Sequence, residues 1–515
     1  MVARMFGAVF ALGVMMSASA AQAEWHEASS DHFLVIADQN ETDVREFTER
    51  LERFHSAMAS VLRREETRPS PSNRVTIYVV RSGRDVRKLA GDKSGFLQGF
   101  YQPRAGGSVA FTARVEGEGK DVSQTEQTLL HEYAHHVMHG ASEWATPRWL
   151  SEGFAEFFST ARFERDGGVG LGLPANHRAM ELLYAKDVPI EALLDSKAYE
   201  QSRTKAYDEF YGRSWLLYHY LQLSGKRPGQ LGAYRTELAN GASEIDAAKK
   251  VFGDLKALDK ELGAYFNQSK MNYVPIASNR LKVEAITVRK MREAEAAIMP
   301  VILESKRGVN DETGKALLPR AQAIAAQYPA DPAVLAALAE AEHDAGNFAA
   351  AVAAADKALA VSPALVNAHV QKIFALSRIA TDADDAEAAW KTVRKAVTAL
   401  NKVEPDHPIP LIYYYRSLQG SGKDISELAA HGLERALQLA PYDQGVRWQV
   451  VQQLVDEEAY GAAYRTLMPL ANDPHNRGED NPAIALLADI KQKWEARAAV
   501  EKAAAAAPAT KAATK

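Results

Sequence analysis

The chain has 515 residues, a formal net charge of −5 and no cysteine. This length is enough for two or three domains with their own cores, because a single core seldom grows beyond about 250–300 residues. The mixed charge argues against nucleic acid as a partner, since polyanion binding needs a basic face. Without cysteine there is neither a disulfide nor a thiolate ligand, so nitrogen and oxygen atoms would have to hold any bound metal.

The first 23 residues predict a secretory signal peptide. They combine one early arginine, a short apolar run and an Ala-Gln-Ala sequence that ends at Ala23. The apolar run is short for a bilayer span, and small residues after it are typical of a cleavage site. The alternative is an uncleaved membrane anchor. We expect an exported protein, periplasmic or secreted, with no membrane span after cleavage.

Residues 24–120 predict a small sheet with helices packed on it. Apolar residues recur at helical spacing between about Glu41 and Arg64, which indicates an amphipathic helix. Three short segments bounded by turn residues predict strands: 32–37, 74–80 and 106–114.

Residues 121–289 are expected to be mainly helical and to hold the functional site. Helices are predicted from Ser123 onward, over 146–163 and over 209–223. Ser123 and Glu126 form a Ser-x-x-Glu capping box, whose side chains satisfy backbone donors at a helix start. Thr146 followed by Pro147 is a favourable start for the second helix.

Residues 290–490 predict a solenoid of tetratricopeptide-like repeats. Prolines recur there at spacings of 33 to 42 residues, close to the period of a helix-turn-helix array. The segment 332–363 fits the repeat pattern best, and its small residues would let paired helices approach closely. The alternative is a generic α-helical domain. Residues 491–515 are rich in alanine and predict a disordered tail.

The segment HEYAH, residues 131–135, carries a His-Glu-x-x-His pattern inside the first predicted helix. His131 and His135 lie one turn apart on one helix face, where two imidazoles can bind one zinc ion at about 2 Å each. Glu132 is placed to take a proton from a water molecule without binding the metal itself. The chain has 14 histidines, so the alternative is a helix that is rich in histidine by chance.

A catalytic zinc site usually has three protein ligands. His139 is a poor third ligand, because positions 131 and 139 are about 12 Å apart along a helix axis. Glu152, on the next predicted helix, is the expected third ligand. Glu156, one turn later, is expected to accept a hydrogen bond from the second ring nitrogen of a ligand histidine. The alternative places both glutamates on a solvated face, where glutamates usually lie.

HEYAHH followed by WLSEGFAEFF resembles the gluzincin metallopeptidases, the group of thermolysin-like and aminopeptidase-like zinc enzymes. The resemblance covers about residues 30–225 and implies a zincin-like fold. It implies Zn²⁺ bound by His131, His135 and Glu152, with Glu132 as general base and Glu156 supporting a ligand. It also implies that Tyr211, in YGRSWLLYHYL, stabilises the tetrahedral intermediate as a hydrogen-bond donor. The alternative for Tyr211 is a core tyrosine.

Two departures from the aminopeptidase pattern bear on the substrate. Serine stands at position 151 in place of the usual asparagine, and the Gly-x-Met-Glu-Asn strand has no counterpart, since 106–114 contains no glutamate. Exopeptidase activity is therefore not expected. The strand over 106–114 could pair with an extended peptide through backbone hydrogen bonds, which favours internal cleavage.

The sequence thus predicts an α+β zincin-like catalytic domain followed by an all-α tetratricopeptide-like solenoid. The expected function is that of an exported zinc metallopeptidase, an endopeptidase acting on a peptide or protein substrate. The repeats are expected to recruit the substrate or a protein partner. The alternative is a catalytically idle zincin-repeat scaffold for protein-protein interaction.

Overall fold

The computed structural model describes residues 24–500 apart from short segments, and it traces the backbone on to residue 506. The segments left out are 66–67, 94, 96, 115–119, 140–145, 205 and 472–480. The predicted signal peptide, residues 1–23, lies outside the described residues, and export stays a prediction. Within the described part of the chain, no helix has the length and the apolar character needed to cross a membrane.

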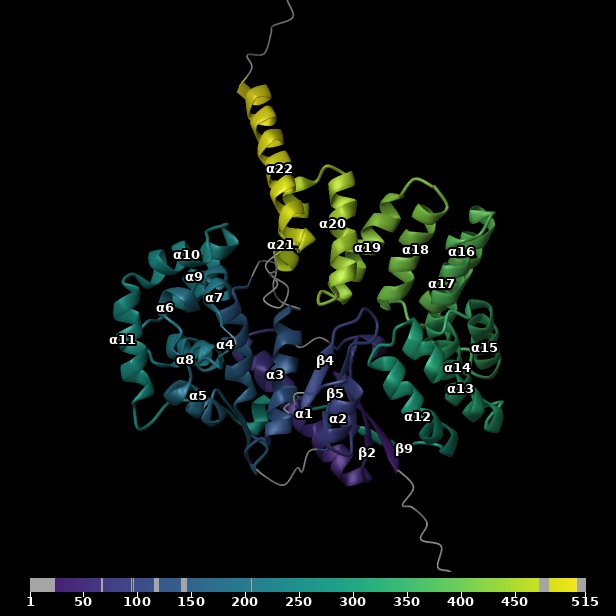
Figure 1. Cartoon of the computed structure of the whole chain (residues 1–515), viewed down its shortest axis with the longest axis horizontal. Coiled ribbons are helices and arrows are strands. Elements are labelled where there is room, and N and C mark those ends of the chain that lie inside the picture. The colour runs from purple at the N-terminus through teal and green to yellow at the C-terminus, as the bar shows by residue number, and fades with distance from the viewer. Residues whose placement is uncertain are drawn as a thin grey trace, which may run out of the picture.

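A six-stranded mixed sheet lies near the centre of the molecule (Figure 1). Its strands, in spatial order, are β4 (Gly99–Gln102), β5 (Val109–Ala113), β3 (Val75–Val80), β2 (Phe33–Asp38), β1 (Trp25–Ser29) and β9 (Thr287–Lys290). Strands β5, β3 and β2 run parallel, and the other three pair antiparallel with their neighbours. The strands predicted over 32–37 and 74–80 are confirmed as β2 and β3.

The strand predicted over 106–114 forms as β5, but its place in the sheet differs from the expectation. β5 pairs with β3 on one side and with β4 on the other, so its backbone groups are engaged within the sheet. The edge strands of this sheet are β4, which is next to β5, and β9 at the opposite side. A peptide cannot add to β5 as a new strand, so the expected peptide pairing with this strand is wrong.

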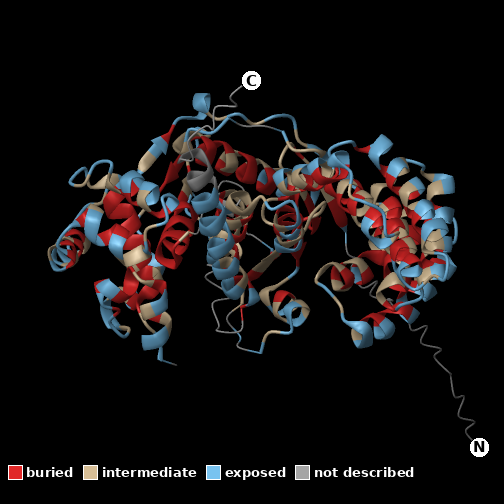
Figure 2. Cartoon of the chain, turned by 90° about the horizontal axis from the view of Figure 1, so that it is seen from above, coloured by how far each residue is buried: buried red, intermediate tan, exposed pale blue. Residues whose placement is uncertain are grey.

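Helices cover both faces of the sheet. The covering helices are α1 (Glu41–Leu62) and α3 (Gln124–His139) on one face, and α2 (Gly83–Ala90) and α12 (Glu293–Lys306) on the other. Phe54 of α1 and Leu130 of α3 share one buried cluster with Ile77 of β3. Met299 of α12 shares a second cluster with Phe111 of β5. Because both faces are buried, the parallel strands are apolar on both sides, and Figure 2 shows the buried residues gathered inside these layers.

The segment between α3 and β9 is mainly helical and contains a second, three-stranded sheet. Its helices are α4 (Arg148–Ser159), α5 (Ala179–Tyr184), α6 (Ile190–Leu193), α7 (Ser196–Ser202), α8 (Phe210–Leu223), α9 (Gln230–Ala239), α10 (Glu244–Phe252) and α11 (Leu255–Phe266), and its strands are β6 (Ala161–Phe163), β7 (Val169–Leu171) and β8 (Val274–Ile276). The helix predicted over 209–223 is confirmed as α8. The helix predicted over 146–163 is too long, because the chain leaves α4 at Thr160 and pairs as β6 with β7.

The region predicted as a solenoid is an array of antiparallel helices. After α12 it contains α13 (Asp311–Gln327), α14 (Pro332–Asp344), α15 (Phe348–Val361), α16 (Val366–Thr381), α17 (Ala386–Val403), α18 (Pro408–Gly420), α19 (Glu427–Leu439), α20 (Gln444–Asp456) and α21 (Tyr460–Ala471). Consecutive helices pack against each other, as the repeat pattern predicted. The tail predicted as disordered over 491–515 is instead helical up to Ala506 as part of α22 (Pro482–Ala506), because alanine strongly favours helix. Residues 507–515 lie outside the described part.

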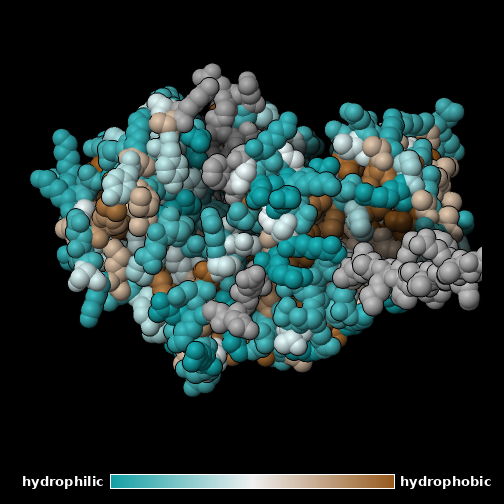
Figure 3. All heavy atoms as spheres, turned by 60° about the horizontal axis from the view of Figure 1, so that its bottom comes forward, coloured by the Kyte–Doolittle hydropathy of each residue, from teal (hydrophilic) through white to brown (hydrophobic). Residues whose placement is uncertain are grey.

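The array arches back over the central sheet, as Figure 1 shows. The backbone N–H and the hydroxyl of Ser72 both donate to Glu404, at 2.9 and 2.8 Å. The backbone N–H of Ala105 donates to Asp443 at 2.7 Å. The space-filling view in Figure 3 shows a mainly hydrophilic surface with apolar side chains gathered in a hollow on its right side.

Candidate metal centre

Helix α3 is held in place at its start by a buried ion pair. The Ser123 hydroxyl accepts from the backbone N–H of Glu126 at 3.2 Å, which is one half of the predicted capping box. The other half is not the one predicted. Both carboxylate oxygens of Glu126 accept from Arg50 of α1, at 2.8 and 2.7 Å. The Glu126 side chain thus pairs with a neighbouring helix in place of its predicted part in the cap, and it fixes α3 against α1.

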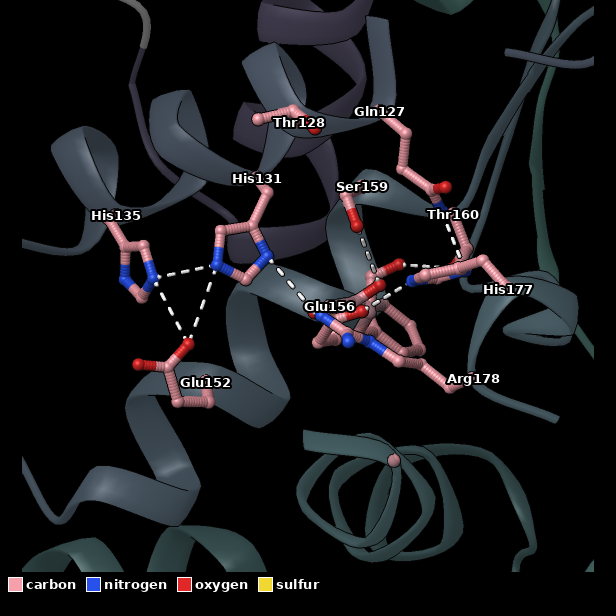
Figure 4. A network of polar contacts seen from close by, with 12 residues as sticks. Gln127, Thr128, His131, His135, Glu152, Glu156, Ser159, Thr160, His177 and Arg178 are labelled. Carbon is pink, nitrogen blue, oxygen red and sulfur yellow. Dashed lines mark hydrogen bonds and ion pairs between the residues drawn. The ribbon is translucent and has the colours of Figure 1, made fainter. Parts of the chain in front are cut away.

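The side chains of His131, His135 and Glu152 meet at one point between α3 and α4 (Figure 4). The two histidine Nε2 atoms are 3.1 Å apart, and they lie 3.4 and 3.5 Å from one carboxylate oxygen of Glu152. Ligands at about 2.0–2.1 Å from a tetrahedral zinc ion are about 3.4 Å from each other. The distances between the three candidate ligand atoms therefore fit those expected around one zinc ion.

In the buried cluster, hydrogen bonds and charges outweigh the effect of burial on the pKa values of His131 and Glu152. Burial acts to raise the pKa of Glu152, but the hydrogen bonds and charges of the two histidines outweigh it and hold that pKa well below its usual range. Burial acts to lower the pKa of His131, but the hydrogen bond with Glu152 and the charges of the nearby glutamates raise it to about 9. Two histidines and a buried carboxylate are a donor set suited to zinc.

Glu156 lies where the sequence predicted, with an oxygen 3.4 Å from Nδ1 of His131. It also contacts Nε2 of His177 at 2.8 Å and accepts from Arg178 at 2.5 Å. Burial acts to raise the pKa of Glu156, but these partners together with His131 bring it down to about 2. Glu156 is thus a buried anion that orients the ring of His131, the role outer partners of ligand histidines commonly have.

The second ligand histidine has a different outer partner. Nδ1 of His135 lies 3.3 Å from the hydroxyl of Ser151, which belongs to α4 and precedes Glu152. The serine that stands in place of the usual asparagine therefore contacts a proposed ligand. Helix α4 supplies one candidate ligand and a polar partner for each histidine, so the whole cluster depends on how α3 and α4 pack.

The remaining histidine of the HEYAHH segment has no part in the cluster. Nδ1 of His136 hydrogen-bonds the hydroxyl of Tyr101 at 2.5 Å, and its ring lies 4.5 Å from that of Tyr442 in the array. Glu132, next to His131, is only partly buried, and its charge is one of those that raise the pKa of His131. One face of α3 thus holds the cluster while another contacts the array.

Tyr211, at the start of α8, lies close enough to the cluster for the charge of Glu152 to change the pKa of the tyrosine hydroxyl. The carboxylate of Glu152 is the main reason why the pKa of the Tyr211 hydroxyl rises to about 12, with burial adding to the effect. Arg148 and Arg178 act in the opposite direction. At neutral pH the hydroxyl therefore keeps its proton and remains a hydrogen-bond donor.

Three residues of this neighbourhood escaped the sequence analysis. Arg148 has a signal that could have found it, because it lies four positions before Glu152 on the same face of α4. His177 and Arg178 follow the β6–β7 hairpin and have no spacing relative to the motif that a local pattern would detect. His177 and Arg178 contact Glu156 only because the chain turns back toward α4 after β7.

The segment that holds the cluster matches a family of unknown function. The model of the family described as "Protein of unknown function (DUF1570)" matches residues 126–234, which include all three candidate ligands and Tyr211. No curated protein matches the chain.

Solved structures overlap with the chain only partly. The TPR protein TTC0263 from Thermus thermophilus is 15% identical, with 39% of this chain and 99% of that chain covered and a TM-score of 0.32. MamA from Desulfovibrio magneticus RS-1 is 16% identical, covering 36% and 99%, with a TM-score of 0.28. Yeast Tom70 is 13% identical, covering 61% and 66%, with a TM-score of 0.27. TM-scores of this size place the chain with none of these proteins.

These findings overturn the resemblance to the gluzincin metallopeptidases. The motifs that carried it lie within residues 126–234, and the family matched there has no assigned function. The physical reason for the misassignment is that a His-Glu-x-x-His helix followed by a glutamate-bearing helix is a short pattern, which ligand geometry alone can impose. The chain is not assigned to that family, and the cluster of His131, His135 and Glu152 rests on the distances between its side-chain atoms.

Proposed function

We propose that the chain is a zinc-dependent hydrolase that cleaves peptide bonds at the cluster of His131, His135 and Glu152. The observation that carries the proposal is the convergence of three ligand atoms at 3.1 to 3.5 Å from one another between two buried helices. Two histidines and a glutamate form a ligand set used by zinc hydrolases, and Glu132 lies beside the first ligand, where a general base is needed.

The chain's own residues divide the chemistry among them. A bound zinc ion would polarise the scissile carbonyl and lower the pKa of water. Glu132 would accept a proton from the attacking water and pass it to the leaving amine. Tyr211, kept protonated beside Glu152, would donate a hydrogen bond to the carbonyl oxygen as negative charge develops on it.

The test separates metal binding from catalysis. Glu132→Gln should keep zinc and lower the rate of peptide hydrolysis by about 10²–10⁴-fold, because the general base is lost. His135→Ala should lose both zinc and hydrolysis. Glu46→Gln, on the exposed side of α1, is the matched control and should change neither. Zinc content by elemental analysis and digestion of a broad peptide library are the measurements. Equal turnover by the Glu132→Gln protein would exclude this mechanism.

A second candidate function is a scaffold that binds other proteins, and the helical array favours it. Stacked helix pairs such as α14 and α15 form the extended surfaces that repeat proteins use for binding. On this reading the metal cluster holds α3 and α4 together and has no catalytic role. Bound zinc with no cleavage of any peptide, together with a saturable protein partner for the array, would favour the scaffold over the hydrolase.

A further inference from the structure

The array and the central sheet enclose a groove that shares no residue with the metal cluster. The groove has a volume of about 630 Å³, within the ~300–1,000 Å³ range of ligand sites. On one side it is lined by every second helix of the arch in Figure 1, namely α12, α14, α16, α18 and α20. On the other side it is lined by β2, β3, β5 and the turn between β4 and β5. A groove that crosses so many helices is long, which suits an extended chain better than a compact molecule.

Three arginines line this groove and are hydrogen-bonded to neutral groups. Arg74 and Arg104 come from the side of the sheet, and Arg416 comes from α18. Arg104 donates to the side-chain oxygen of Gln102 at 2.6 Å. Arg416 donates to the side-chain oxygen of Gln449 at 2.8 Å, and Arg74 donates to one hydroxyl and two carbonyl oxygens. Among the residues that the structure describes, no carboxylate forms an ion pair with any of these three guanidiniums.

The carboxylates that line the groove have partners of their own. Glu404 and Asp443 accept the hydrogen bonds that hold the array against the sheet. Glu340 of α14 pairs with Lys306 of α12 at 2.8 Å. The lining thus holds four cationic side chains against three acids, and the acids are already engaged. The charges left to meet a ligand are positive, and they lie on both sides of the groove.

Neutral side chains fill the space between these charges. Asn367 of α16 and Gln449 of α20 bring amide groups into the lining, and Phe374 of α16 and Tyr413 of α18 bring aromatic rings. The guanidinium carbon of Arg416 lies 4.9 Å from the centre of the Tyr413 ring. Amide side chains can both donate to and accept from a peptide backbone, and aromatic rings can pack against apolar side chains. The groove therefore combines cations, amides and rings along its length.

We propose that this groove binds an acidic, extended peptide segment of a partner protein. Carboxylates of the segment would pair with Arg74, Arg104 and Arg416, in charge-assisted hydrogen bonds that are about twice as strong as neutral ones. Apolar residues between the acids would pack on the rings of Phe374 and Tyr413. Nucleic acid is a poorer occupant, because the chain carries a net charge of −5 and no basic face was found in its sequence. The inference rests on the scaffold function proposed above and does not depend on hydrolysis.

Fluorescence anisotropy with a pair of labelled peptides tests the preference for acidic residues. The probe is a short peptide in which glutamate and leucine alternate, and the control peptide has glutamine in place of each glutamate. The full-length Glu132→Gln chain is used, so that the proposed hydrolysis does not consume the peptides. The glutamate peptide should bind about tenfold more tightly than the glutamine peptide, and high salt should remove most of that difference. Equal affinity for the two peptides, or binding of neither, would overturn the inference.

Substitutions on both sides of the groove test the location. Arg104→Met and Arg416→Met should each weaken binding of the glutamate peptide by about tenfold. Arg104→Lys keeps the charge and should weaken it by only about threefold, which guards against a general loss of structure. Arg394→Met is the matched control, because Arg394 of α17 is also largely buried and donates to the Ser417 carbonyl but does not line the groove. It should leave the affinity unchanged. A loss for Arg394→Met equal to that for Arg416→Met would overturn the assignment to this groove.

Failure of this inference can be told apart from failure of the scaffold proposal. A protein partner that binds the wild type, Arg104→Met and Arg416→Met chains with equal affinity would keep the scaffold function but overturn the groove as its site. A chain that binds neither the glutamate peptide nor any protein partner would exclude both. Cleavage of peptides by the wild type bears on neither result, because the groove and the metal cluster have no residue in common.

Discussion

The region that carries the candidate metal cluster and the helical array are held together in different ways. In the first, buried polar contacts join residues far apart in the chain, such as Arg50 with Glu126 and Arg178 with Glu156. In the array, small buried residues such as Ala339 and Ala355 let consecutive helices pack closely. A change in the first region should therefore reach the site from a distance, whereas a change in the array should stay with neighbouring helices.

The largest effect is expected from breaking the buried pair between α1 and α3. Arg50→Met should lower the free energy of unfolding by about 3–5 kcal/mol, because Glu126 would be left as a buried charge. The Arg50 and Glu126 side chains are only 11% and 2% exposed. Chemical denaturation measures the change.

The same helix offers a matched control for that experiment. Arg45 pairs with Glu41 on the exposed side of α1, and Arg45→Met should cost only about 0.3–0.5 kcal/mol. An equal loss in the free energy of unfolding for Arg50→Met and Arg45→Met would show that the buried pair does not anchor α3.

Substituting one tightly packed glycine in each region by alanine compares the two regions directly. A Cβ at Gly153 of α4 would lie 2.4 Å from the backbone oxygen of Ser214 in α8, and one at Gly314 of α13 would lie 2.4 Å from that of Asp344 in α14. Each change to alanine should cost about 3 kcal/mol, near the upper end for overpacking. Only Gly153→Ala should weaken the proposed zinc binding, because Gly153 follows the candidate ligand Glu152.

Zinc affinity and thermal unfolding of both glycine variants are the measurements. Gly263→Ala in α11 is the control, since a Cβ there meets no atom within 4 Å, and it should be neutral or stabilising. Loss of zinc affinity in Gly314→Ala would mean that strain in the array reaches the metal cluster.

Acidification should weaken both regions through one buried histidine in each. Burial lowers the pKa of His219 in α8 to about 4, against a hydrogen bond to the Gly172 carbonyl that raises it. Burial likewise lowers the pKa of His407 in the array to about 4, against the charge of Glu404. The unfolded chain takes up protons first as pH falls below about 6.5, so the stability that each neutral histidine contributes is full above that pH and is lost toward about pH 4.

The expected loss between about pH 7.5 and about pH 5 is about 2 kcal/mol for each histidine. Unfolding of His219→Gln and His407→Gln at both pH values checks it, since each variant should show a smaller loss on acidification than the wild type. If the stability of either variant falls on acidification as much as that of the wild type, the substituted histidine does not cause the loss.

The smallest effect is expected where the two regions touch. Ser72→Ala removes one hydrogen bond to Glu404 and should cost about 1 kcal/mol. Ser70→Ala, in the same turn, removes only an exposed bond of 3.3 Å to the Asp406 carbonyl and should cost almost nothing. Differential scanning calorimetry measures both. A cost for Ser72→Ala no larger than that for Ser70→Ala would show that this contact does not hold the array against the sheet.

Local patterns predicted much of the candidate site. Histidines four residues apart define a helix face whatever the tertiary structure, and Glu152 and Glu156 share a face of the next helix for the same reason. His177 and Arg178 were missed because they reach Glu156 only through contacts between elements. Glu126 shows the same limit, since its spacing from Ser123 predicted a local cap while its carboxylate pairs with Arg50.

The sequence by itself determined α1, α3 and α8, three strands of the central sheet, the helical array and the three candidate ligands, because each follows from short-range spacing along the chain. Only the tertiary structure decided that the strand over 109–113 lies inside the sheet, that the array contacts the sheet through Glu404 and Asp443, and that Arg178 lies over the ring of Tyr211. Strand order, docking and the placement of buried charges depend on contacts between distant segments, and no local periodicity encodes these.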